Sequence, residues 1–262
     1  MAAPLPKEDR GAEVSRLRLL IAGSGTAPVY QQPQGDAPPI QAPAPLRPLL
    51  RNGHIQRGAV VAVINQAPAA WGSANYLALA LTAAATAAGA WCGVVGVPAF
   101  GIAAASGLGA DLHRFLTLDK PGERWANAVA ILAGACDLVL WQPPPRVGSD
   151  YDRRIRARLR PGERQRGAAL IVLGAWQHPD LTLTATDSRW HGLGQGTGHL
   201  TGRLVTVTAF GRAAAGPDVS TRVWLPDSEG VLREPTEAER PTERPTTASE
   251  SRQAGQRFSA AN

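Results

Sequence analysis

The sequence of 262 residues has few of the side chains that build metal centres or disulfide frameworks. Its two cysteines, Cys92 and Cys136, both lie in apolar stretches. Two thiols in such surroundings are typical of small buried hydrophobic residues, because a disulfide scaffold needs more cysteines and a zinc site needs more ligands. His178, His191 and His199 have no zinc-ligand spacing and no cysteine nearby. We therefore expect no metal site.

Charge is missing from one long segment. No Asp, Glu, Lys or Arg occurs between Arg57 and Asp111, and residues 77–97 are long enough to span a bilayer. That stretch is nevertheless rich in Ala, Thr and Gly, whereas membrane insertion depends mainly on Leu, Ile, Val and Phe. Residues 1–16 lack the apolar core of a signal peptide. We expect a cytoplasmic protein with no membrane contact.

Lysine and aromatic residues are also scarce. Only Lys7 and Lys120 are lysines among 27 basic residues, and aromatic residues make up 5% of the chain. The core must therefore consist mainly of Ala, Val and Leu. The formal net charge is +6, and most of this excess lies in residues 146–166, where eight arginines stand against three carboxylates.

Apolar runs and helical periods alternate through the centre of the chain. Short apolar runs predict buried strands at residues 59–64, 91–97, 137–141 and 168–174. Helical spacing predicts helices at residues 73–88, 122–135 and 150–160. Strands that alternate with helices indicate a mostly parallel α/β sheet with helices on both faces.

The pattern changes in the C-terminal third. Residues 181–187, 203–209 and 221–225 alternate apolar and polar side chains, which predicts an antiparallel extension with one solvated face. Three regions are therefore expected. They are an N-terminal helix (9–22) with a Pro-rich linker over 1–48, a core over 49–232, and a disordered tail over 233–262.

A strand, a loop and an Ala-rich helix follow one another in the order of a phosphate-binding loop, GxxxxGK[ST]. In that pattern the glycines let backbone N–H groups surround the phosphates, the lysine neutralises charge, and the hydroxyl binds magnesium. Here Asn65 and Ala70 occupy the glycine positions, Trp71 the lysine position and Gly72 the hydroxyl position. The segment therefore reads as a degenerate phosphate loop.

The acidic residues of nucleotide hydrolysis are missing as well. Gln142 follows the third strand, where an Asp would organise magnesium, and Pro98 ends the second strand, where a carboxylate would activate water. We expect no ATPase activity, no catalytic residue and no bound cofactor. Trp71 and Trp91 flank the loop in sequence and are expected to fill the space of a nucleotide.

The order of these segments resembles a degenerate RecA protein over residues 46–230. No single motif carries the resemblance, which rests on the order of four segments and includes Pro121-Gly122-Glu123 before the predicted magnesium strand. The segments resemble the approach to the phosphate loop (46–64), the lead to the magnesium strand (118–142), the helix and strand that follow (151–174) and the closing β-meander (181–225). The resemblance implies a RecA-like fold.

The same resemblance bears on DNA binding. RecA proteins bind single-stranded DNA through two mobile loops after the third and fourth strands. Here the first loop could only be residues 143–150, and the second is reduced to residues 177–180. A four-residue connection cannot wrap a DNA strand, so we expect no RecA-style filament on DNA.

A RecA-like core without ATPase residues, with a short N-terminal helix and a disordered tail, is similar to the ImuA group and especially to the actinobacterial ImuA-prime proteins. The resemblance implies a non-catalytic accessory protein in DNA-damage-induced mutagenesis. The implied partners are an ImuB-type protein, which is an inactive relative of Y-family polymerases, and through it an error-prone DnaE-type polymerase and the sliding clamp. The implied location is the cytoplasm, with association to the nucleoid on DNA damage.

Two other functions stay open: a SulA-like inhibitor of cell division that binds FtsZ, and a non-ATPase DNA-binding RecA paralogue. The helix at 9–22 is expected to pack on a neighbouring molecule, which allows self-association. Phe258 is the only aromatic residue of the tail. It could anchor a partner, and an inert tail fits equally well.

The arginine-rich segment has the period of an amphipathic helix. Tyr151, Ile155 and Leu159 form an apolar stripe that docks the helix and leaves its arginines facing water. Such a face is typical of a nucleic-acid or acidic-partner surface, and also of a solvated helix in an arginine-biased proteome. No aromatic side chains are interleaved for base stacking. The arginines of the expected surface are Arg153, Arg154, Arg156, Arg158 and Arg160.

Overall fold

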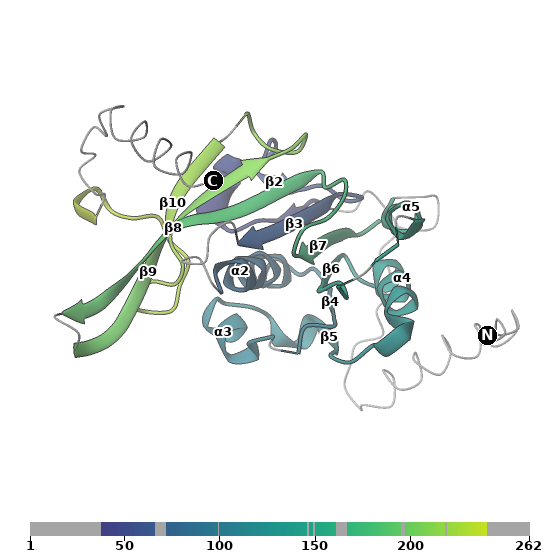
Figure 1. Cartoon of the computed structure of the whole chain (residues 1–262), viewed down its shortest axis with the longest axis horizontal. Helices are drawn as coiled ribbons and strands as arrows, with labels where there is room; N and C mark the ends of the chain where they lie inside the picture. Colours follow the sequence, from purple (N-terminus) through teal and green to yellow (C-terminus); the bar gives the residue numbers. More distant parts are fainter. Residues whose placement is uncertain are drawn as a thin grey trace, which may run out of the picture. The chain divides into compact units, whose positions relative to one another are not determined.

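A computed structural model describes residues 38–65, 72–98, 100–145, 147–148, 150–160, 167–194, 197–217 and 219–239. The chain divides into two compact units, residues 1–38 and 39–262, and the architecture that follows is that of the second unit (Figure 1). The predicted helix at 9–22, together with Ala70, Trp71 and Phe258, lies outside the described residues.

The second unit is built on one eight-stranded sheet with the order β10-β9-β8-β3-β7-β6-β4-β5. The six strands from β8 to β5 are parallel to one another, and β9 and β10 continue the sheet in antiparallel fashion. The strands are β3 (Val60–Asn65), β4 (Cys92–Val95), β5 (Phe115–Leu118), β6 (Leu138–Trp141), β7 (Ala169–Leu173), β8 (Leu181–Gly194), β9 (Thr197–Phe210) and β10 (Val219–Trp224).

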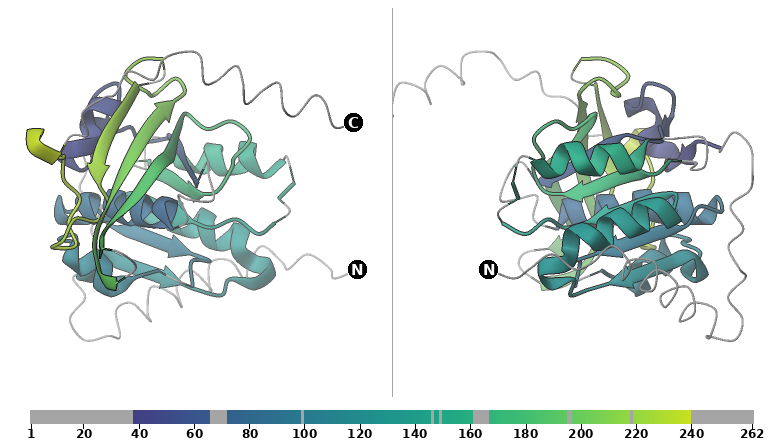
Figure 2. Two further views of the ribbon diagram at one scale, coloured as in Figure 1. Left: turned by 60° about the vertical axis from the view of Figure 1, so that its left-hand side comes forward. Right: turned by 90° about the vertical axis from the view of Figure 1, so that its right-hand side faces the viewer.

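Helices cover both faces of this sheet (Figure 2). Helix α2 (Ser73–Ala87) packs on one face together with α3 (Ile102–Gly107), while α4 (Trp125–Ala135) and α5 (Asp150–Leu159) pack on the other. The predicted fold class, a mostly parallel α/β sheet with helices on both faces and a C-terminal antiparallel extension, is confirmed. The shorter elements are β1 (Ile40–Gln41), β2 (His54–Ile55), η1 (Ala44–Leu49), η3 (Leu112–Arg114), η4 (Gly122–Arg124) and η5 (Glu237–Glu239).

The central strands are apolar throughout because both of their faces are buried. Successive side chains of a strand point to opposite faces. In β7, Ile171 and Leu173 accordingly join the cluster under α2, whereas Leu170 and Val172 join the cluster under α4 and α5. This arrangement explains why the sequence shows short unbroken apolar runs rather than alternation.

The long uncharged segment folds as a helix and a strand. Residues 77–97 form most of α2 and all of β4, and Gly89 (φ +92°) lies at the turn between them. A positive φ of this kind costs glycine little and ends the helix. Within the described ranges, no helix is long and apolar enough to cross a membrane.

Core contacts begin before residue 49, and contacts with the second unit continue past residue 232, so both bounds of the predicted core were too narrow. Ile40 pairs with Ile55 in the small β1–β2 sheet, and Leu46 of η1 is buried in the core, so the predicted linker over 1–48 already contributes core residues. Within the predicted tail, the Arg233 guanidinium binds the carboxylates of Asp227 (2.9 Å) and Glu239 (2.8 Å). These short elements escaped the sequence analysis because tertiary contacts rather than periodicity define them.

The antiparallel extension is also longer than predicted. Strand β8 pairs with β3 only through Ala185, and its remainder pairs with β9 alone. The two strands therefore continue beyond the sheet as a two-stranded ribbon, which is visible in Figure 1. At the end of this ribbon, Leu193 pairs with Gly198 and Gly194 pairs with Thr197.

Asp180, directly before β8, connects three parts of the fold. Its buried carboxylate accepts hydrogen bonds from the backbone N–H of Val60 (2.8 Å), from the guanidinium of Arg156 on α5 (2.9 Å) and from Arg212 after β9. Burial alone would raise the pKa of Asp180, but the Val60 N–H and the arginines outweigh it, and the pKa lies below its ordinary value of 3.8.

We expect Asp180→Asn to lower the free energy of unfolding by about 2–4 kcal/mol, because it removes the buried negative charge that the Val60 N–H, Arg156 and Arg212 bind. Urea denaturation measures this change. The control is Asp150→Asn, whose side chain is 71% exposed. This exposed substitution is expected to change stability by no more than about 0.5 kcal/mol.

The ion pair between Asp180 and Arg156 also predicts how stability depends on pH. Because the folded-state pKa of Asp180 lies below its ordinary value, the carboxylate stabilises the fold above about pH 4, and this stabilisation is lost as the pH falls through the folded-state pKa. The stability difference between wild type and Asp180→Asn should shrink on acidification. A difference that stays constant to the acid end of the titration would contradict this assignment.

Candidate functional site

The ends of the parallel strands define where a ligand site is expected in this fold. In open α/β sheets, ligands bind at the carboxyl ends of the strands, where the connecting loops gather. The carboxyl ends of β3, β4, β6 and β7 lie at one edge of the sheet because these strands are parallel. Asn65 and Gly72, the described positions of the predicted phosphate loop, lie at this edge together with the two lost acidic positions.

Asn65, the last residue of β3, occupies the helix terminus that would hold a phosphate. Its side-chain oxygen accepts a hydrogen bond from the backbone N–H of Ala74 in the first turn of α2 (2.8 Å). Gly72 precedes the helix with φ +76°, and the buried hydroxyl of Ser73 has no hydrogen-bond partner. One N–H donor of the α2 terminus is therefore satisfied by the protein itself.

The two lost acidic positions also lie where the sequence placed them. Pro98 follows β4, and Gln142 follows β6, where its backbone N–H binds the carbonyl of Val95 (3.1 Å). Both side chains are exposed. With Asn65 on the helix terminus and no carboxylate at either position, the described residues of this edge do not fit a magnesium nucleotide held in the RecA manner.

Trp91 does not flank the degenerate loop. It directly precedes β4 and therefore lies at the amino end of the strands, whereas the loop follows β3 at the carboxyl end. Its backbone N–H binds the carboxylate of Asp137 (2.9 Å), and the Arg114 guanidinium lies over its ring. The prediction that Trp91 fills a nucleotide space is wrong. Trp91 and the loop are close in the sequence, but the direction of β4 places them at opposite ends of the strands.

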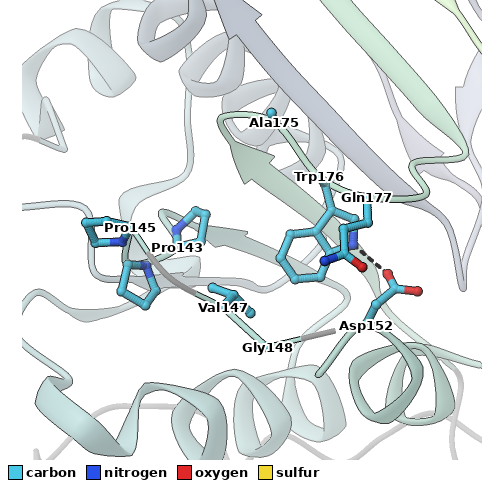
Figure 3. A pocket seen from close by; sticks show the side chains of 9 residues that line it. Pro143, Pro145, Val147, Gly148, Asp152, Ala175, Trp176 and Gln177 are labelled. Carbon is cyan, nitrogen blue, oxygen red and sulfur yellow. Dashed lines mark hydrogen bonds between the residues drawn. The ribbon is translucent and has the colours of Figure 1, made fainter. Parts of the chain in front are cut away.

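A pocket of about 190 Å³ opens at the carboxyl ends of β6 and β7 (Figure 3). The loop after β6 contributes Pro143 and Val147, the loop after β7 contributes Trp176 and Gln177, and Asp152 reaches it from α5. These two loops stand at the positions that bind DNA in the RecA resemblance. They are short here, and together they line the pocket.

Aromatic contacts hold this pocket in place. The Trp176 indole donates a hydrogen bond to the Asp152 carboxylate (2.6 Å), which fastens the loop after β7 to α5. Trp176 also meets the buried Trp141 edge to face at 5.3 Å between ring centres, and Trp141 stacks on Trp125 of α4 at 5.0 Å. A chain of rings thus extends from α4 through the core to the pocket.

Arg156 is part of this framework rather than of the exposed surface. Its side chain is 18% exposed and binds Asp152 (3.1 Å) and Asp180 (2.9 Å). Burial alone would lower the pKa of Arg156, but the two carboxylates outweigh it and raise the pKa above its ordinary value. The prediction that Arg156 faces water with its neighbours is wrong, because carboxylates of α5 and of the segment before β8 draw it inward.

The apolar stripe of α5 is as predicted. Ile155 and Leu159 are buried, Tyr151 packs on the same cluster, and the remaining four arginines of the expected surface are exposed. At about 100° per residue, these arginines divide between two flanks of the helix. Arg153 and Arg160 lie toward the flank of Asp152 and Arg156, and Arg154 and Arg158 lie toward the flank of Tyr151 and α4.

No metal centre emerges at this edge. Among the residues with a described structure, no group of three or more His, Cys, Asp or Glu side chains could hold a metal ion. His178, His191 and His199 are exposed, and Cys92 and Cys136 are buried free thiols. Burial raises the pKa of Cys136 to about 12, with a further contribution from the nearby Asp137 carboxylate.

The comparisons with known proteins identify a family. Residues 48–178 match the model of the MT3502 N-terminal domain, which covers half of the chain, and the chain belongs to this family. It is also similar to the uncharacterized protein Rv3395c of Mycobacterium tuberculosis, at 36% identity over 116 residues. That match covers 43% of this chain and 54% of the relative, so the chain spans about half the length of the curated relative.

The pocket was not predicted from the sequence. Pro143 and Trp176 each follow a predicted parallel strand, and that placement was the available signal, because loops after parallel strands meet at the carboxyl edge. The sequence does not show that Trp176 bonds to Asp152, since the two residues are 24 positions apart.

The Asn65 contact generates a stability prediction. We expect Asn65→Ala to lower the free energy of unfolding by about 1 kcal/mol, because it removes the acceptor of the Ala74 N–H. Asn65→Asp keeps an acceptor and places negative charge at the α2 terminus, so it should match or exceed wild-type stability. Equal denaturation midpoints for Asn65→Ala and wild type would show that the contact contributes nothing.

Proposed function

We propose that the chain is a non-catalytic accessory protein of DNA-damage-induced mutagenesis, acting in translesion synthesis within an SOS-type response. In this proposal it works in the cytoplasm and associates with the nucleoid after damage. It links an ImuB-type protein to an error-prone DnaE-type polymerase and the sliding clamp. The observation that carries the non-catalytic part is the Asn65–Ala74 hydrogen bond, which uses a donor that a nucleotide phosphate would need.

Two further observations support an adaptor over an enzyme. Gln142 and Pro98 stand where magnesium chemistry would require carboxylates, and both are exposed at the sheet edge. The placement of the function in mutagenesis is supported by the resemblance of residues 46–230 to the ImuA group, because a fold by itself does not determine function.

The non-catalytic proposal predicts the response to nucleotide. A ligand that binds only the native state must raise the Tm. Because we expect no nucleotide binding, Mg-ATP at about 1 mM should leave the Tm of the full chain within about 1 °C of its nucleotide-free value. Differential scanning fluorimetry measures this, with Mg-ADP and magnesium alone as controls. A reproducible, concentration-dependent rise would contradict the proposal.

The partner is tested by co-purification. We expect an ImuB-type protein to co-purify with the full chain at low and moderate salt. A chain ending at Glu239 keeps the ion pairs of Arg233 and separates the contribution of the remaining tail, including Phe258. Absence of the complex at both salt concentrations would overturn the mutagenesis assignment. Inhibition of FtsZ polymerisation would then favour the SulA-like alternative, and salt-dependent binding to DNA the paralogue alternative.

A further inference from the structure

We propose that the pocket lined by residues 143–145, 147–148 and 175–177, together with the adjoining Arg153 and Arg160, binds an acidic protein segment that inserts one apolar side chain. This inference rests on the proposed adaptor function and names the chemistry of the partner. It assigns a binding role to a surface formed by the shortened loops at the carboxyl edge (Figure 3).

The apolar part of the pocket lining suits a single apolar side chain. Pro143 and Val147 border it on one side and Trp176 on the other, so the inserted group meets rigid rings and a branched aliphatic side chain. Trp176 is held by Asp152 and by Trp141, so binding requires little ordering of the site. Buried aromatic anchors in such pre-formed pockets carry much of the binding energy of protein interfaces.

The hydrogen-bonding character of the rim favours a polypeptide. Pro143, Pro144 and Pro145 line the pocket, and a proline offers a carbonyl acceptor but no N–H donor. Asp152 adds a carboxylate at the same rim. A peptide backbone brings N–H donors to such acceptors, whereas a phosphate backbone brings only acceptors and negative charge.

The charge next to the pocket specifies the flanking residues of that peptide. Asp152 lines the pocket, and Arg153 follows it with a side chain that is 85% exposed. Arg160, which directly follows the last residue of α5, lies on the same flank about 12 Å beyond Asp152, at 1.5 Å of rise per residue. An extended peptide covers that distance with about four residues. Acidic residues are therefore expected within about four positions of the apolar anchor.

A selection experiment tests this chemistry without a known partner. A library of random twelve-residue peptides is displayed and selected on the immobilised full chain. We expect the recovered sequences to combine one large apolar residue with two or more Asp or Glu residues on one side of it. Recovery of only neutral or basic sequences, or of none above the background of the support, would overturn the proposal.

Substitutions then locate the site with a synthetic peptide of the recovered sequence. Ala175 is exposed and lines the pocket, so Ala175→Phe fills the space without removing a core contact and should weaken binding by at least about tenfold. The pair Arg153→Glu and Arg160→Glu should weaken it by a similar factor, more at low salt than at high salt. Fluorescence anisotropy of the labelled peptide measures both.

The matched control lies on the same helix. Arg154→Glu with Arg158→Glu makes an equal change in net charge on the opposite flank of α5 and should weaken binding by less than about threefold. An equal loss from both pairs would show non-specific attraction to the basic helix and overturn the site. Tight binding of a twelve-nucleotide oligothymidine that Ala175→Phe abolishes would assign the pocket to nucleic acid instead.

The test separates the pocket from the proposed function. If the ImuB-type protein co-purifies equally with wild type and with Ala175→Phe, the pocket is not its docking site and the adaptor function stands. If selected peptides bind through the pocket and the ImuB-type protein does not co-purify, the pocket stands and the mutagenesis assignment fails.

Discussion

One buried carboxylate connects the elements that surround the pocket. The Asp180 carboxylate accepts hydrogen bonds from the backbone N–H of Val60 at the start of β3 and from the guanidinium groups of Arg156 and Arg212. It thereby fixes α5 against the sheet at the point where β8 begins. Asp152, which Arg156 also binds, receives the Trp176 indole. An ion-pair network centred on the buried Asp180 therefore positions the pocket. The same network sets the orientation of α5 and so of its exposed arginines.

Among the described residues, the carboxyl edge of the sheet carries a pocket and does not carry the groups that hold a magnesium nucleotide. In a nucleotide-hydrolysing relative, this edge needs free N–H donors, a lysine and carboxylates that hold magnesium. Here Asn65 satisfies one of the helix donors, and Gln142 and Pro98 replace the carboxylates. Trp176 fastens the loop after β7 to α5, and a pocket opens at the same edge between this loop and the described residues that follow β6. A pre-formed surface of this kind needs little ordering when it binds a partner.

The sequence was sufficient for the layered fold because each central strand is buried on both faces. That burial forces unbroken apolar runs such as Ala169–Leu173, which a single sequence displays directly. It was insufficient for β5, whose half-exposed residues give no clear period, and for β1 and η1, which are defined by contacts with distant segments. A parallel sheet also fixes the direction of β4, and this direction places Trp91 at the amino end of the strand. The prediction that Trp91 fills a nucleotide space considered only its distance from the loop in the sequence.

The helix α5 shows most clearly what a sequence can and cannot say about a site. Its stripe of Tyr151, Ile155 and Leu159 was readable, because the period of a helix determines which residues dock. The position of the Arg156 side chain could not be predicted from the helical period. It depends on Asp180, which is 24 positions away in the sequence and is brought next to α5 by the fold after β7. Once Arg156 is drawn inward, the remaining arginines no longer form one uniform face. The helix then has one flank beside a pocket and another beside α4, and a basic segment that looked uniform becomes two surfaces with different neighbours.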